Sequence, residues 1–107
     1  MRLRELEAKF LVRDSDKSIR FVDSIEEAQG IMFLCPKCFH NDRGAHQVIC
    51  WFRGKVPDDV TPGPGRWNPS GTGLDDLTFV PPGAVSVWLS GEGGCGWHGF
   101  VVNGEAQ

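Results

Sequence analysis

The stretch Ile31-Met32-Phe33-Leu34-Cys35-Pro36-Lys37-Cys38 decides the fold that the sequence predicts. Its first four residues form a continuous apolar run, which is typical of a buried strand, and the run leads directly into Cys35. Two cysteines separated by two residues can place both sulfur atoms on one side of a tight turn, where Pro36 fixes φ. We therefore expect a strand that delivers Cys35 to a metal ion and a turn that adds Cys38.

A second pair of soft metal ligands follows after 56 intervening residues, in Cys95-Gly96-Trp97-His98. Gly96 gives this turn the backbone freedom that such turns often need. Three cysteines and one histidine have the composition of a closed tetrahedral zinc site, and such an ion adds folding energy to a small domain. The sequence thus predicts Zn²⁺ as cofactor, with four protein ligands: Cys35, Cys38, Cys95 and His98.

Three further residues are alternative ligands. Cys50 lies inside an apolar segment and is interpreted as a small buried hydrophobe, although it can replace His98. His46 precedes Cys50 by four residues, about 13 Å along a strand, so the two cannot easily bind one ion. His40 lies close to Cys38 in sequence. We interpret both histidines as polar residues of a loop or a strand end.

A redox pair is the alternative to a metal site for Cys35 and Cys38. The surrounding sequence does not predict that this pair opens a helix in a βαβ unit. A redox role also leaves the pair Cys95 and His98 unexplained. The metal site is therefore the preferred interpretation.

The remaining sequence predicts one mainly β domain spanning residues 1–107. A capping box, Ser24-Ile25-Glu26-Glu27, predicts a short helix that Gly30 ends. Residues 54–73 contain four Pro and five Gly and predict a long irregular loop, where we expect function to lie. The fold class is a small antiparallel, zinc-ribbon-like sheet with one short helix, and its strands are expected at 5–13, 19–22, 31–34, 46–52, 77–80, 85–89 and 99–103.

Charge and hydropathy limit the function classes. The formal net charge is -3 and the isoelectric point is about 5.5. Such a chain lacks the strong basic field of a protein that binds nucleic acid mainly through phosphates. No apolar run approaches the roughly 20 residues of a membrane span, and the N-terminus lacks a signal-peptide core. We expect a cytoplasmic protein whose cysteines stay reduced.

The pattern around both ligand pairs resembles a family of uncharacterised zinc-ribbon-like small proteins from bacteriophages and bacteria. The resemblance covers residues 31–104, from the Cys-Pro-x-Cys pair to the Cys-x-x-His pair and its closing Asn103-Gly104. It implies zinc binding and a phage origin, with action in the host cytoplasm. Relatives of this type are sometimes labelled ammonia monooxygenase, but nothing in this ligand set suggests a copper oxygenase.

Three functions follow from these patterns. The first is a zinc-binding module with a structural ion and a protein partner. The second is a hydrolase-type zinc enzyme with an open metal position and a base from His46, Glu92 or Asp75-Asp76. The third is a nucleic-acid-binding zinc ribbon, for which the candidate residues are Arg43, Arg53, Lys55, Arg66, Trp51 and Trp67.

Overall fold

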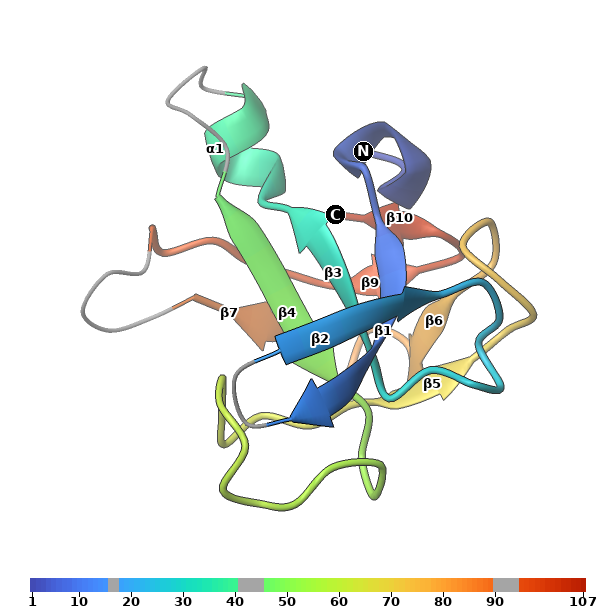
Figure 1. Ribbon diagram of the computed structural model, residues 1–107. Helices are drawn as coiled ribbons and strands as arrows, with labels where there is room; N and C mark the ends of the chain where they lie inside the picture. The colour runs from blue at the N-terminus through green and yellow to red at the C-terminus, as the bar shows by residue number, and fades with distance from the viewer. Residues whose placement is uncertain (16–17, 41–45, 90–94) are drawn as a thin grey trace.

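A four-stranded antiparallel sheet in the order β2-β1-β3-β4 is the largest element of the computed structural model (Figure 1). The structure describes residues 1–15, 18–40, 46–89 and 95–107, without the side chain of His40. The four strands are β1 (Lys9–Ser15), β2 (Ser18–Val22), β3 (Gly30–Leu34) and β4 (Gln47–Trp51).

Three two-stranded antiparallel sheets complete the β structure, and each pairs neighbours in the chain. Together with the large sheet they confirm the predicted mainly β class. Within the described ranges, no helix is long and apolar enough to cross a membrane. The small sheets are β5 (Asn68–Ser70) with β6 (Thr78–Val80), β7 (Val87–Trp88) with β8 (His98–Gly99), and β9 (Val101–Val102) with β10 (Glu105–Ala106).

The large sheet buries apolar side chains on both faces. Phe33 and Cys50 belong to the larger core cluster, together with residues of the small sheets such as Phe79. Met32 and Trp51 belong to a second cluster, which Val56 and Val60 also join. Because successive strand residues point to opposite faces, the apolar run of β3 supplies both clusters, as expected for a strand buried on both sides.

One helix prediction and one strand prediction need correction. The segment after Ser24 forms a turn, in which Ser24 Oγ accepts a hydrogen bond from the Glu27 amide at 3.4 Å. The cap geometry is present, but β3 starts at Gly30 and leaves no room for a helix. The short helix of the described residues is instead α1 (Pro36–His40). The predicted strand 5–13 is replaced in part by a 3₁₀ turn, η1 (Leu3–Leu6).

Arg66 organises the irregular segment of residues 54–66, here called the Arg66 loop. Its guanidinium donates hydrogen bonds of 2.8–3.4 Å to backbone carbonyls of the same loop. Trp51 Nε1 adds a 3.0 Å bond to the Thr61 carbonyl. Charge-assisted bonds to carbonyls satisfy backbone groups that lack a strand partner. The five carbonyls that Arg66 reaches belong to Pro57, Asp58, Val60, Pro62 and Gly65.

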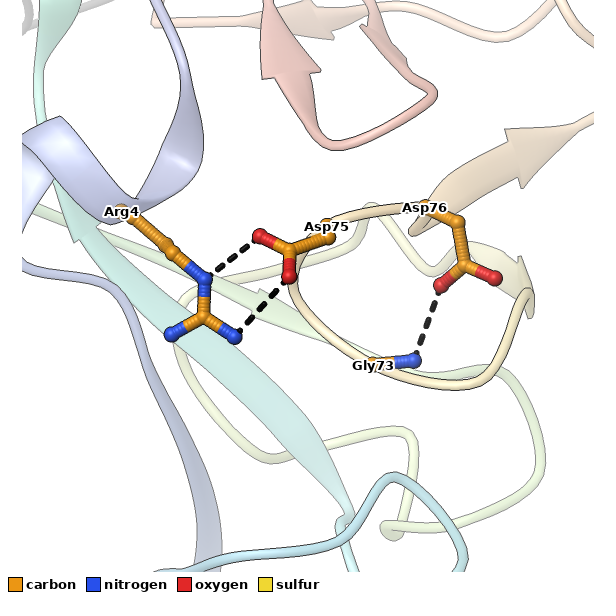
Figure 2. A network of polar contacts seen from close by, with 4 residues as sticks. All are labelled: Arg4, Gly73, Asp75 and Asp76. Carbon is orange, nitrogen blue, oxygen red and sulfur yellow. Dashed lines mark hydrogen bonds and ion pairs between the residues drawn. The ribbon is translucent and has the colours of Figure 1, made fainter.

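Asp75 and Asp76 hold the chain before β6. Arg4 lies beside the Asp75 carboxylate, and Asp76 accepts a hydrogen bond from the Gly73 amide (Figure 2). Arg4 Nη2 is 3.2 Å from Asp75 Oδ2, and the Gly73 bond is 2.9 Å long. Asp76 also accepts bonds from Thr72. Hydrogen bonds from Arg4 lower the pKa of Asp75, and amide donors lower that of Asp76. Both carboxylates therefore stay ionised as turn-forming groups.

Candidate metal centre

The first ligand pair lies where β3 ends and α1 begins. Cys35 is fully buried, and its amide donates a 2.8 Å bond to the His46 carbonyl. Its own carbonyl accepts the Phe39 amide at 2.9 Å, which opens the helix, and Pro36 occupies the first helical position. A helical turn thus takes the place of the predicted tight turn and carries Cys38.

The start of this helix also supports a thiolate. Backbone N–H groups of Lys37 and Cys38 donate hydrogen bonds to the Cys35 sulfur. Such donors favour the charged form of a thiol. These donors lower the pKa of Cys35, but burial raises it by more, so the thiol keeps its proton in the metal-free cluster.

The second ligand pair begins in the strand pair β7–β8. Gly96 has φ +83°, in the left-handed region that favours glycine, which confirms the expected need for a flexible turn. Its amide donates to the Leu89 carbonyl at 2.9 Å, and the Leu89 amide donates to the Trp97 carbonyl at 2.8 Å. The Trp97 amide donates to the Cys95 sulfur. Strand pairing thus fixes the position of Cys95.

Three cysteines and one histidine come together at this point. The ligand atoms of Cys35, Cys38, His46 and Cys95 all lie within 4.8 Å of one another. The sulfur atoms of Cys35 and Cys95 are 3.5 Å apart, and His46 Nε2 is 3.4 Å from the Cys95 sulfur. Zinc–sulfur bonds of about 2.3 Å at tetrahedral angles require sulfur atoms about 3.8 Å apart. The cluster therefore has the dimensions of a four-ligand metal site.

His46, not His98, accompanies the three cysteines. His98 lies on β8, next to the buried Trp97, and strand alternation turns its side chain to the other face. Its ring lies 5.6 Å from the Trp88 ring and 6.2 Å from the Phe100 ring, centroid to centroid. The interpretation of His46 as a mere strand-end residue therefore needs correction.

Antiparallel pairing is what delivers His46. It directly precedes β4, and its carbonyl accepts the Cys35 amide across β3–β4. The prediction that His46 and Cys50 cannot easily bind one ion agrees with the structure, because His46 belongs to the cluster and Cys50 does not. Cys50 is fully buried opposite Ile31, and burial raises its pKa far above the usual thiol range. His40 ends α1, and its side chain is not among those described.

The thiols of the cluster differ in their affinity for protons. Burial raises the pKa of Cys35 to about 11, against the effect of its amide donors. Burial also raises the pKa of Cys95, but hydrogen bonds from His46, from the Trp97 amide and from the other two thiols outweigh it and lower that pKa to about 6. Without a metal the cluster thus holds a thiolate at Cys95 and a thiol at Cys35.

Lys37 connects the two ligand pairs. Its Nζ donates a 2.9 Å hydrogen bond to the Cys95 carbonyl. Three thiolates around a divalent ion leave a net negative charge, which an adjacent ammonium stabilises. The cluster is therefore supported by a cation as well as by amide donors.

The donor set selects the kind of metal. Thiolate and imidazole ligands in a tetrahedral arrangement suit zinc and exclude hard ions such as Mg²⁺ and Ca²⁺, which prefer oxygen. Four protein ligands leave no position for a substrate or an activated water. Of the bases considered for an enzyme, Asp75 is paired with Arg4 and Asp76 bonds within its own turn (Figure 2). His46 is itself in the cluster, and Glu92 lies outside the described residues.

No protein-family model, no curated protein and no solved structure matches this chain. The resemblance to zinc-ribbon-like proteins of phages and bacteria therefore stays a prediction. The case for a metal centre depends on the geometry of the cluster alone.

Proposed function

We propose that this chain is a small module with one structural zinc ion, bound by Cys35, Cys38, His46 and Cys95, and that its role is to bind another protein. The observation that carries the zinc proposal is the mutual distance of four soft ligand atoms, all within 4.8 Å. Zinc suits this donor set best, and a reducing cytoplasm is the compartment that keeps such thiols available.

A structural role follows from where the ligands come from. They belong to the β3–α1 junction, to the residue before β4 and to the segment before β8, and Cys95 is separated from His46 by 49 positions in the sequence. An ion at this point joins the large sheet to the β7–β8 pair. Its binding energy is then folding energy.

A protein partner agrees with the surface better than a nucleic acid does. Trp88 and Phe21 expose 64% and 52% of their surface. Arg66, a candidate for phosphate binding, turns its guanidinium into its own loop, and Arg53 donates to the Arg66 carbonyl. With a net charge of -3, the chain offers apolar contacts rather than a basic field.

Native mass spectrometry of the purified protein tests the zinc proposal. We expect one zinc ion per chain, released by a chelator together with a large drop in melting temperature. Zinc K-edge X-ray absorption should then give three sulfur ligands and one nitrogen ligand, with no oxygen. A protein with intact thiols that carries no metal would refute the proposal, and an additional oxygen ligand would favour the enzyme.

A further inference from the structure

Residues of β4 and β7 line a common groove. It encloses a cavity of about 540 Å³. Its walls are residues 46–49 on one side and residues 86–89 on the other, and the segment 62–65 and Trp67 complete it. We call it the β4–β7 groove; it begins at His46, beside the metal centre.

The β4 wall is a free strand edge. The bonds from the Cys35 amide to the His46 carbonyl and from the Phe52 amide to the Gln29 carbonyl show that even-numbered residues of this strand face β3. In an antiparallel pair the alternate residues direct their N–H and C=O groups to the opposite edge. Gln47 and Ile49 therefore direct theirs to the groove, where no described residue binds them.

The β7 wall is a second strand edge. The Leu89 amide, directly after β7, donates to the Trp97 carbonyl, so the preceding residue, Trp88, directs its backbone groups away from β8. The groove lies on that side of β7, because its walls include Trp88 and exclude His98. Two strand edges thus border one groove.

The chain itself already uses the β4 edge further along. The Trp67 amide donates a 3.2 Å bond to the Trp51 carbonyl, and Phe52 and Trp67 form a parallel bridge. The residues before Trp67 then leave the edge and line the far side of the groove. The open part at Gln47 and Ile49 therefore continues an edge that accepts extended chain.

The walls also define the chemistry of an occupant. None of the lining residues is Asp, Glu, Lys or Arg, and His46 is the titratable one. Such a wall neither neutralises phosphates nor pairs with a charged side chain. Exposed backbone donors and acceptors are instead satisfied by another extended backbone.

We propose that the β4–β7 groove binds an extended, uncharged segment of a partner protein, which adds as a strand to β4. This inference builds on the proposed protein-interaction role and names its surface. The indole of Trp88, exposed at the rim, contributes an apolar contact. Because His46 joins the groove to the cluster, binding requires the metal-loaded form.

Heptapeptides selected from a random phage-displayed library against the zinc-loaded chain provide the probe. We expect their complexes to shift the amide NMR signals of Gln47, Ile49 and Trp88. Trp88→Ala should weaken binding at least about tenfold, as should N-methylation of a central peptide amide. The matched control is Phe21→Ala, another exposed aromatic residue, on β2, which should leave affinity unchanged.

A second variant tests the backbone directly. Ile49→Pro removes the amide that faces the groove but no bond to β3, as tolerated on an edge strand. Binding should be lost while the zinc content, checked by native mass spectrometry, stays at one ion per chain. If Ile49→Pro does not fold, Trp88→Ala and the N-methylated peptides still test whether the groove binds the peptide.

The outcomes separate this inference from the proposed function. Peptides that bind at Phe21 or elsewhere would overturn the proposal that the β4–β7 groove is the binding site, but they would still support a protein-interaction role. A library without any binder would overturn both, whereas a chain without zinc would overturn the metal proposal. Sedimentation that shows a dimer blocked by Ile49→Pro would make a second copy the occupant, and would also overturn the partner proposal.

Discussion

The metal centre and the Arg66 loop both hold irregular segments of the chain in place, but they join residues at very different separations in the sequence. The cluster gathers side chains from residues 35–38, 46 and 95, so it spans most of the sequence. Arg66 binds carbonyls no more than nine residues away. Loss of the cluster therefore separates whole elements, whereas loss of Arg66 releases one loop.

The two regions also differ in what they need from outside. The cluster places three thiols and an imidazole within 4.8 Å, an arrangement that a bound ion stabilises. The Arg66 loop satisfies its carbonyls with a cation that the chain carries itself. Under the proposed function, metal supply would control the cluster and leave the Arg66 loop independent.

The largest effect is expected from Cys95→Ser. The variant loses the ligand that ties β8 to the large sheet, and with it the zinc ion. Ligand binding at about 1,000 times the dissociation constant stabilises by about 4 kcal/mol, so the melting temperature should fall by more than about 15 °C. Differential scanning calorimetry and metal analysis measure both changes.

Cys50→Ala is the matched control for that variant. Cys50 is buried but lies outside the cluster, so the variant should keep one zinc ion and lose only about 1 kcal/mol of stability. Equal zinc loss in both variants would contradict the ligand assignment.

The histidines give the next largest effect. His46→Ala removes a proposed direct ligand and should weaken zinc binding by at least about 100-fold. Substituting a residue that only hydrogen-bonds to a ligand typically has a smaller effect on metal affinity. His98→Ala removes an exposed ring that lies tilted against the Trp88 ring and should leave affinity unchanged. Competition with a chromophoric chelator compares the two. The reverse result would restore the ligand set expected from the sequence.

The difference between these histidines shows what sequence spacing can predict. Cys35, Cys38 and Cys95 were predictable because each follows or precedes an apolar strand at a spacing typical of metal ligands. The choice of histidine depends on strand register and on which face a side chain takes. Cys-x-x-His spacing favoured His98, but strand alternation turns it away from the sulfur atoms.

A signal for His46 was present in the order of the elements. Antiparallel neighbours joined by a loop place the start of the second strand beside the end of the first. His46 directly precedes β4 and Cys35 directly follows β3, and the Cys35 amide donates a hydrogen bond to the His46 carbonyl. The fold class was predictable from alternating apolar runs, whereas the helix expected at Ser24 failed because a cap alone does not supply helical length.

The Arg66→Lys variant tests the Arg66 loop, which needs no metal ion. An ammonium cannot reach five carbonyls in the planar fork of a guanidinium, so the variant should lose about 1–3 kcal/mol of stability. Zinc content should stay at one ion per chain. Hydrogen exchange should accelerate at Val60, whose amide bonds to the Pro57 carbonyl, and stay unchanged at Phe33 in β3. Zinc loss in Arg66→Lys would show that the two regions are coupled.

The smallest effect is the pH dependence of zinc affinity, which should belong to the cluster alone. The pKa of Cys35 is raised to about 11 in the metal-free protein, so zinc binding at pH 7 to 9 must displace its proton. Apparent affinity should therefore rise at least about tenfold per pH unit. Cys95 has a pKa of about 6 and is already a thiolate between pH 7 and 9. Below pH 6 Cys95 is protonated as well, so zinc binding must displace a second proton and the affinity should depend more steeply on pH.

Calorimetric titration in buffers of different ionisation enthalpy counts the protons that zinc binding releases. An affinity that stays constant from pH 7 to 9 would contradict the role of Cys35 as a ligand. The Arg66→Lys variant should show the same dependence of zinc affinity on pH, because zinc binding displaces no proton from a residue of the Arg66 loop.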